Sequence, residues 1–303
     1  MGWCLPVFDS DCYIELRTTP HGGRSLFATR DIPLGTRIHT SLAPLAHVIY
    51  KDYRREVCTQ CFAYSASDLA PPEVAQSRAW SVKWSPGPGA SAAWFCSENC
   101  KKVWEQDETG PLQVQLDAIL AKAQAASRRK GKSMNDISLS LDPKEDITQE
   151  KIDQAWKKME VLATSKAHLA AYCSALDLAD MELEIARYLA SAIVRQYVSE
   201  RRHAVSEHAG MRPPWSHLLH LQDNELANVR ERPYLLSTHL RIYAFLCNAL
   251  PKHLKPYVSS VRDVLARDTG NAFGIWDGDR RDEMLGWGIW TSASYFNHST
   301  SSV

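Results

Sequence analysis

The chain has 303 residues, of which 45% are hydrophobic and 23% are charged, ordinary values for a globular protein with a sizeable core. Its 35 basic and 35 acidic residues give a formal net charge of zero, which offers no electrostatic case for binding nucleic acid or an anionic membrane. No run approaches the ~18 apolar residues of a membrane span, and the first residues lack the basic-then-apolar order of a secretory signal. We therefore expect a protein of the nucleus or cytoplasm, in which the eight cysteines are thiols or metal ligands before they are disulfides.

The first predicted elements are strands. Residues 13–17 and 36–40 alternate apolar and polar side chains, and residues 25–29 are rich in strand formers. Turn-forming sequences at 21–24 and 31–35 separate these runs. We expect a β-rich unit over residues 11–57.

Two cysteine pairs come next, within residues 58–105. They are Cys58-x-x-Cys61 and Cys96-x-x-x-Cys100, and a short helix is predicted at 99–106. Two such pairs can hold one tetrahedral zinc ion with Zn–S distances of ~2.3 Å. No histidine lies between His47 and His168, so we expect an all-thiolate, structural site. The alternative, four unrelated thiols, fits the close spacing of the pairs poorly.

The middle of the chain predicts a linker and then helices. Residues 124–146 are polar and carry a basic run at 128–132, which indicates a flexible linker within a unit at 106–147. The basic run is more typical of a solvated segment than of a nuclear import signal. Residues 148–208 have helical apolar spacing, and further helices are predicted at 223–229, 234–249 and 257–267. These form a helical insertion over 148–256. Strand-like patterns return at 272–276 and 286–290, inside a last unit at 257–303.

Three short segments carry a family resemblance when they are taken together. They are the glycine turn and following strand at 22–32, Asn271-Ala-Phe, and Ser294-Tyr-Phe-Asn-His-Ser299. Their order, with the cysteine module between the first two, resembles the SET-domain protein lysine methyltransferases. The subgroup with a MYND zinc finger inserted in the SET domain is the most similar. The resemblance covers residues 13–104 and 257–303.

The resemblance implies an α+β fold, in which a β-rich SET domain is interrupted by a zinc finger and a helical insertion. It also implies binding of S-adenosylmethionine and methyl transfer to a lysine-bearing protein, histone or other. The residues that it places at the methyl donor are Arg24, Ser25, Asn271, Ser294, Asn297 and His298. A guanidinium can pair with the donor's carboxylate, and asparagine amides can bind its ammonium and carboxylate groups.

The sequence departs from the family pattern in two places. Thr300 stands where the family has cysteine, and no residue matches the following strand or the catalytic tyrosine. We therefore expect the C-terminal SET portion to be missing, the 303-residue chain to lack turnover, and its catalytic residues to be unknown. The finger lacks the family's second ligand set, so we expect one zinc ion. The alternative function is a non-enzymatic zinc-containing scaffold that binds proteins through its helices.

Overall fold

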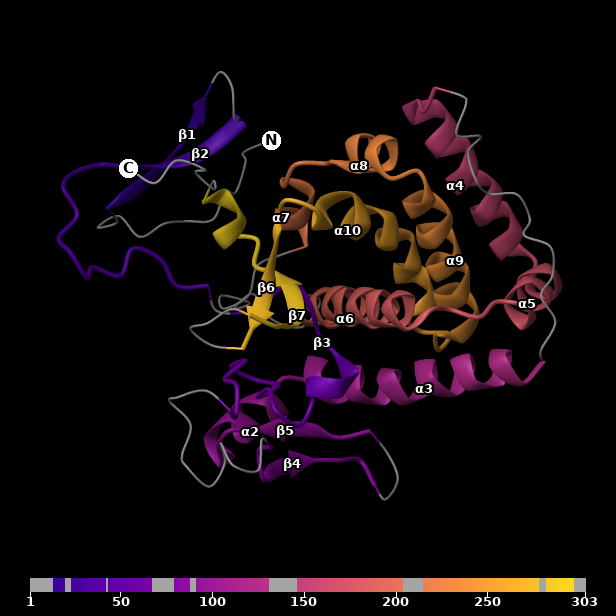
Figure 1. Cartoon of the computed structure of the whole chain (residues 1–303), viewed down its shortest axis with the longest axis horizontal. Helices are drawn as coiled ribbons and strands as arrows, with labels where there is room; N and C mark the ends of the chain where they lie inside the picture. The colour runs from indigo at the N-terminus through magenta and orange to yellow at the C-terminus, as the bar shows by residue number, and fades with distance from the viewer. Residues whose placement is uncertain are drawn as a thin grey trace.

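The computed structural model describes residues 13–19, 23–41, 43–66, 79–87, 91–130, 146–203, 215–277 and 282–296. Within them the protein is a mixed α+β structure, in which small antiparallel sheets lie beside a bundle of helices (Figure 1). None of the helices in these ranges combines the length and apolar character that crossing a membrane requires.

The strands form three separate antiparallel sheets. A hairpin pairs β1 (Ile14–Thr19) with β2 (Gly23–Ala28), and a second pairs β4 (Val82–Trp84) with β5 (Ala93–Phe95). The central sheet has the order β3-β7-β6, made from Ala46–Ile49, Met284–Ile289 and Ala272–Trp276. The strands predicted near 13–17, 25–29, 272–276 and 286–290 are thereby confirmed.

The strand predicted at residues 36–40 is wrong. That segment is irregular, and the strand comes later, at β3. No strand in the described part of the chain pairs with residues 36–40. Instead, His39 Nε2 lies 3.0 Å from Ser41 Oγ and 3.1 Å from Ser292 Oγ. Burial stabilises β3, because Ala46 and Val48 are only 1% and 3% exposed where the strand packs against the helices.

The helices follow the predicted order closely. They are α2 (Glu98–Glu105), α3 (Thr109–Lys130), α4 (Gln149–Thr164), α5 (Lys166–Ser174), α6 (Asp180–His203), α7 (Ser216–Leu219), α8 (Glu225–Glu231), α9 (Tyr234–Ala249) and α10 (Val261–Asp268), with short 3-10 turns η1 (Lys51–Tyr53), η2 (Lys255–Ser260) and η3 (Ala293–Tyr295). The predicted helices at 99–106, 223–229 and 234–249 are confirmed, and the one at 257–267 is divided between η2 and α10. The long helical pattern from 148 is resolved into α4, α5 and α6.

The linker prediction is wrong for residues 124–130, which form the last turns of α3. Tertiary contacts explain the helix despite its polar sequence. Gln124 Nε2 donates to Leu178 O at 2.7 Å and to Asp177 Oδ1 at 2.8 Å, and Ser127 Oγ donates to Cys173 O at 3.1 Å. Polar side chains here bind neighbouring elements, which composition alone does not reveal. The rest of the predicted linker, 131–145, lies outside the described residues.

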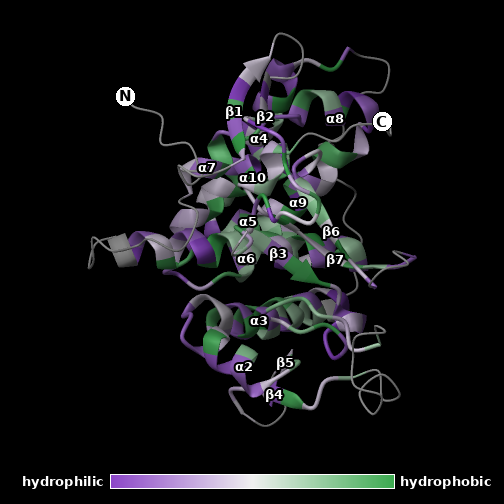
Figure 2. Cartoon of the chain, turned by 90° about the vertical axis from the view of Figure 1, so that its left-hand side faces the viewer, coloured by the Kyte–Doolittle hydropathy of each residue, from purple (hydrophilic) through white to green (hydrophobic). Residues whose placement is uncertain are grey.

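Helix α6 packs against the central sheet through its contact with β3 (Figure 1). Its residues Tyr188, Leu189 and Ile193 are fully buried, and the backbone N–H of His47 in β3 donates to Ser191 Oγ at 2.9 Å. Seen from the side in Figure 2, the β4–β5 hairpin and α2 lie at one end of the molecule beneath α3, and β1–β2 lies at the other. The central sheet therefore stands between the cysteine module and the first hairpin.

Glycine at position 286 is required where β7 passes β3. A Cβ atom on Gly286 would lie 2.1 Å from the carbonyl oxygen of Val48 and 2.9 Å from Cα of Ile49. Both obstacles are backbone atoms of the paired strand, so they cannot move away without loss of pairing. The Gly-Trp-Gly sequence of β7 is thus a requirement of close strand approach.

We predict that Gly286→Ala lowers the free energy of unfolding by about 3 kcal/mol, since relief of the clash requires separation of β3 from β7. Urea titration followed by circular dichroism measures the change. Gly87→Ala is the matched control, because a Cβ atom there meets nothing within 4 Å. Equal stability of the two variants would contradict the argument.

Candidate functional site

The four cysteines predicted as metal ligands lie together. Their Sγ atoms are all within 4.8 Å of one another, with Cys96 3.5 Å from Cys100 and 3.6 Å from Cys61. A tetrahedral ion with Zn–S bonds of ~2.3 Å requires S···S separations of roughly 3.8 Å. The donor set and its spacing therefore fit one tetrahedral metal ion.

Local backbone structure explains why the two cysteine pairs converge. The first pair lies on a tight turn in which Phe62 N–H donates to Cys58 O at 2.9 Å, and Phe62 adopts a positive φ of 63°. The second pair begins α2, where Ser97 caps the helix by accepting from the backbone N–H of Cys100 at 3.2 Å. Thr59 N–H donates to Trp94 O at 2.8 Å, which ties the turn to β5.

The thiols of the cluster differ in pKa because they lie close together. The hydrogen bond from the Cys61 thiol lowers the pKa of Cys58 to about 5, and the same contact raises the pKa of Cys61. Burial is the main cause that raises the pKa of Cys96 to about 11. Ionisation of all four thiols would thus need a positive charge among them, which a divalent metal would supply.

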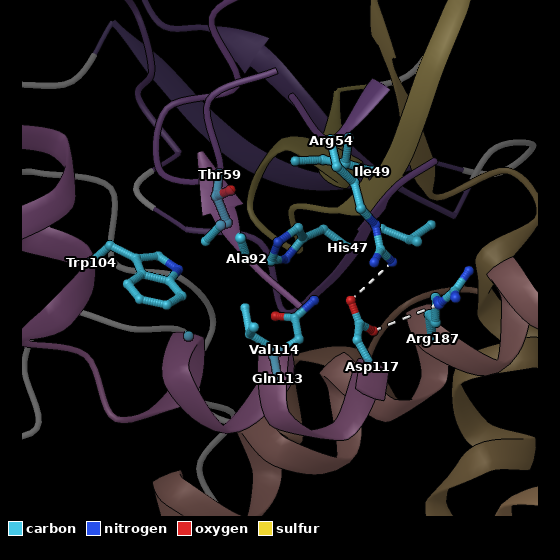
Figure 3. A pocket seen from close by; sticks show the side chains of 13 residues that line it. His47, Ile49, Arg54, Thr59, Ala92, Trp104, Gln113, Val114, Asp117 and Arg187 are labelled. Atoms are coloured by element: carbon cyan, nitrogen blue, oxygen red, sulfur yellow. Dashed lines mark ion pairs between the residues drawn. The ribbon is translucent and has the colours of Figure 1, made fainter. Parts of the chain in front are cut away.

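A buried ion cluster joins the cysteine module to the rest of the protein (Figure 3). Asp117 on α3 forms ion pairs with two arginines. Its Oδ2 atom lies 2.9 Å from Arg54 Nη2, and its Oδ1 atom lies 3.8 Å from Nε of Arg187 on α6. Arg187 also pairs with Glu184 at 2.8 Å. Burial raises the pKa of Asp117, and the two guanidinium groups oppose that rise. The two arginine cations are therefore balanced by the carboxylates of Asp117 and Glu184.

Small crevices beside this cluster separate the module from β3. The one in Figure 3 has a volume of about 40 Å³, and a neighbouring one has about 60 Å³. Both are lined by His47, Thr59 and Trp104. Burial lowers the pKa of His47 to about 3, so the imidazole is neutral. These crevices have room for a few water molecules but not for a cofactor.

The residues predicted at the methyl donor are brought together in part. Arg24 on β2 donates a hydrogen bond to His220 O and lies over the ring of Tyr295, with Cζ 5.2 Å from the ring centre. Ser25 lies on the same strand and is half-buried. Arg24 thus contacts the last motif segment, and its guanidinium is bound to protein groups.

Asn271 and Ser294 also lie together. Ser294 Oγ donates to Asn271 O at 2.8 Å. The amide nitrogen of Asn271 donates to Arg267 O at 2.8 Å and to Gln222 O at 3.2 Å. Both amide hydrogens are therefore used, and only Oδ1 remains for an ammonium group. The predicted residues Asn297 and His298 lie outside the described residues.

Sequence reasoning missed two hydroxyl groups beside Ser294. Thr291 and Tyr295 are 1% and 4% exposed, and Thr291 Oγ1 has no hydrogen-bond partner within the described structure. Burial raises the pKa of the Tyr295 hydroxyl, and the neighbouring Arg24 guanidinium opposes that rise. Buried hydroxyls without partners are costly, which makes this segment a candidate for contact with a polar ligand. No pattern in the sequence could reveal them, because satisfaction of a hydroxyl is a tertiary property.

A buried carboxyl group, that of Asp268, lies three residues before Asn271 in the chain. Asp268 ends α10, and burial raises its pKa to about 6, although Tyr188 and Trp287 oppose the rise. Tyr188 and Trp287 act by hydrogen bonding to the Asp268 carboxyl group, whose Oδ1 atom is buried. The group is therefore a source of pH-dependent stability.

Comparison with known proteins supports the family resemblance at a coarse level. Over 312 aligned residues the chain is 24% identical to the potential protein lysine methyltransferase SET6 of Saccharomyces cerevisiae. The alignment covers 97% of this chain and 80% of the yeast protein. No family model matches the chain, and no solved structure matches it. The likeness extends along the whole chain, including the helical middle, where the sequence motifs match least.

We predict that Asp268→Asn stabilises the protein at neutral pH. The folded-state pKa of about 6 lies above the ordinary aspartate value of 3.8, so stability of the native protein falls as pH rises from about 4 to about 6. The variant should be more stable by about 3 kcal/mol above pH 7, and the gain should vanish near pH 4.

Urea unfolding of both proteins at several pH values measures this difference. Asp282→Asn, at an exposed position, is the control and should change little at any pH. A difference between Asp268→Asn and the native protein that is constant with pH would refute the assignment.

Proposed function

We propose that this chain is a protein of the S-adenosylmethionine-dependent lysine methyltransferase type, with a zinc-binding finger inserted between its first and last SET segments. The observation that carries the proposal is the convergence of three distant segments, in which Arg24 contacts Tyr295 and Ser294 binds Asn271. The similarity to the potential lysine methyltransferase of yeast, which covers 97% of this chain, also supports it.

The described residues offer particular groups to the methyl donor. Asn271 Oδ1 can accept from the ammonium of its amino-acid end, and the buried hydroxyls of Thr291 and Tyr295 can donate to oxygen or nitrogen atoms of the ligand. Arg24 acts mainly as a positioning residue, because its guanidinium holds Tyr295 and the His220 carbonyl. When bound, S-adenosylmethionine supplies the methyl group.

The acceptor in this proposal is a protein lysine, histone or other. A free lysine has a pKa of ~10.4, so removal of its proton at pH 7 costs roughly 4–5 kcal/mol. An apolar channel beside a sulfonium cation lowers that cost, through desolvation and through repulsion between like charges. We assign no catalytic residue to this step.

We further propose that Cys58, Cys61, Cys96 and Cys100 hold one structural zinc ion. Cys58 is fully buried and Cys61 is exposed, so the site would lie at the edge of the finger's apolar cluster of Trp80, Phe95 and Trp104. Four thiolates leave no open position for substrate, so the metal would stabilise the finger and take no part in methyl transfer.

A specific observation also favours the second candidate, a zinc-containing scaffold without enzymatic activity. Arg24 and both amide hydrogens of Asn271 are committed to protein carbonyls, which reduces the groups left for a methyl donor. In that case the helices from α4 to α9 would provide the protein-binding surface, and both functions would place the protein in the nucleus or cytoplasm.

We predict one zinc ion per chain, which elemental mass spectrometry of the purified protein measures. Cys61→Ser should lower zinc affinity on the order of 100-fold or more, because one of four ligands is lost while the exposed position tolerates the change. Cys247→Ser, outside the cluster, should retain the metal. Full zinc content in Cys61→Ser would contradict the ligand assignment.

We predict that the zinc-loaded protein binds S-adenosylmethionine, and that Tyr295→Phe weakens binding by about fivefold, the value of one hydrogen bond. Isothermal titration calorimetry measures both affinities. Tyr243→Phe is the matched control, since Tyr243 lies on α9 among the helices. Incubation with labelled donor and histones or lysate measures transfer separately.

The outcomes separate the two candidates. Absence of donor binding by the folded, zinc-loaded chain would overturn the methyltransferase proposal and favour the scaffold. Donor binding that Tyr295→Phe leaves unchanged would support the function but remove Tyr295 from the site.

A further inference from the structure

A larger cavity lies in the helical part of the molecule, on the side away from β1 and β2 (Figure 1). It has a volume of about 460 Å³ and is formed by the carboxyl ends of α4 and α9, the start of α5, and η2. Small-molecule sites commonly have volumes of ~300–1,000 Å³ and often lie between helices of a bundle. None of the residues considered for the methyl donor or the metal lines this cavity.

The floor of the cavity is apolar and fixed. Tyr243, Leu169 and Val258 line it and are 9%, 5% and 2% exposed. The Tyr243 ring is held edge-on by Trp156, with ring centres 5.5 Å apart. Because these side chains belong to the main core, the floor is a preformed surface that needs no rearrangement to accept an apolar group.

The rim carries positive charge. Lys166 and Lys255 are exposed lining residues, and neither has a carboxylate partner among the residues that the structure describes. Glu160, the acidic residue of the lining, is 3.8 Å from Lys157 and is therefore already paired. Asn248 adds an exposed amide group to the same rim.

The charge of Lys255 also affects the Cys247 thiol, which lines the cavity. Burial raises the pKa of Cys247 to about 11, and the Lys255 ammonium and the Tyr243 hydroxyl both oppose that rise. At neutral pH the Cys247 thiol is thus protonated, and it provides surface rather than a nucleophile. An anion entering the cavity would meet a cation above an uncharged floor.

We propose that this cavity binds a small amphipathic carboxylic acid, with its apolar tail on Tyr243, Leu169 and Val258 and its carboxylate at Lys166 and Lys255. A cationic ligand would be repelled at the rim. A purely polar anion would leave the apolar floor in contact with water, and a neutral apolar ligand would leave both lysines without a partner. The acid is the ligand class that uses both surfaces.

Calorimetric titration of the full chain with octanoate tests the proposal. We expect binding of octanoate, and markedly weaker binding of octanol and octylamine, which share the tail but lack the negative charge. Lys166→Gln combined with Lys255→Gln should weaken octanoate binding by at least about fivefold, the value of two partly exposed ion pairs. Ala163→Phe, which fills the cavity from α4, should abolish it.

The matched control is Lys158→Gln combined with Lys252→Gln, which removes the same charge from exposed positions outside the lining. This control should bind octanoate as the native protein does. Absence of octanoate binding, equal binding of octanol, or equal weakening by the two double variants would each overturn the proposal. Thermal unfolding of every variant verifies that it is folded, and binding of S-adenosylmethionine should be the same in all of them.

Discussion

Pairing of β3 with β7 is the interaction on which the rest of the structure depends. It sets Ala46 opposite Ile289 and Ile49 opposite Gly286, so two segments from distant parts of the sequence form one sheet. In the sequence, the cysteine module and helices α2 to α10 lie between these two strands. The carbonyl of Val48 occupies the space that a side chain at Gly286 would need, which leaves the two strands a single close register. The candidate donor segment follows directly from β7, and its position is therefore set by the same pairing.

The buried ion cluster extends this dependence to the finger. Asp117 connects Arg54, shortly before the first cysteine pair, with Arg187 on the helix that supports the sheet. Replacing one member would leave an uncompensated charge in a buried place, which costs far more than loss of a surface pair. The finger is thus joined to the core by a charge balance as well as by the chain. Folding of the cysteine module and packing of α3 and α6 are therefore expected to be energetically coupled.

Local sequence signals predicted the elements that depend on local chemistry. The spacing of Cys58, Cys61, Cys96 and Cys100 predicted a cluster, and helical periodicity located most helices. β3 escaped prediction because Ala46-His-Val-Ile is only four residues long, and its pairing with β7 and its contact with α6 are tertiary. The end of α3 was missed because Gln124 and Ser127 bind partners some fifty positions away. Motif order pointed to Arg24, Asn271 and Ser294, whereas the hydrogen bonds that their side chains make to the protein depend on tertiary contacts.

The great separation of β3 and β7 along the chain has a consequence for synthesis on the ribosome. Closing a loop of roughly 240 residues adds only a modest entropic cost, but it delays the contact until almost the whole loop has been made. During that interval Ala46 and Val48 have no strand partner. Helix α6 is translated well before β7 and offers Ser191 to the backbone of His47. Contact of α6 with β3 can therefore form during synthesis before β3 pairs with β7.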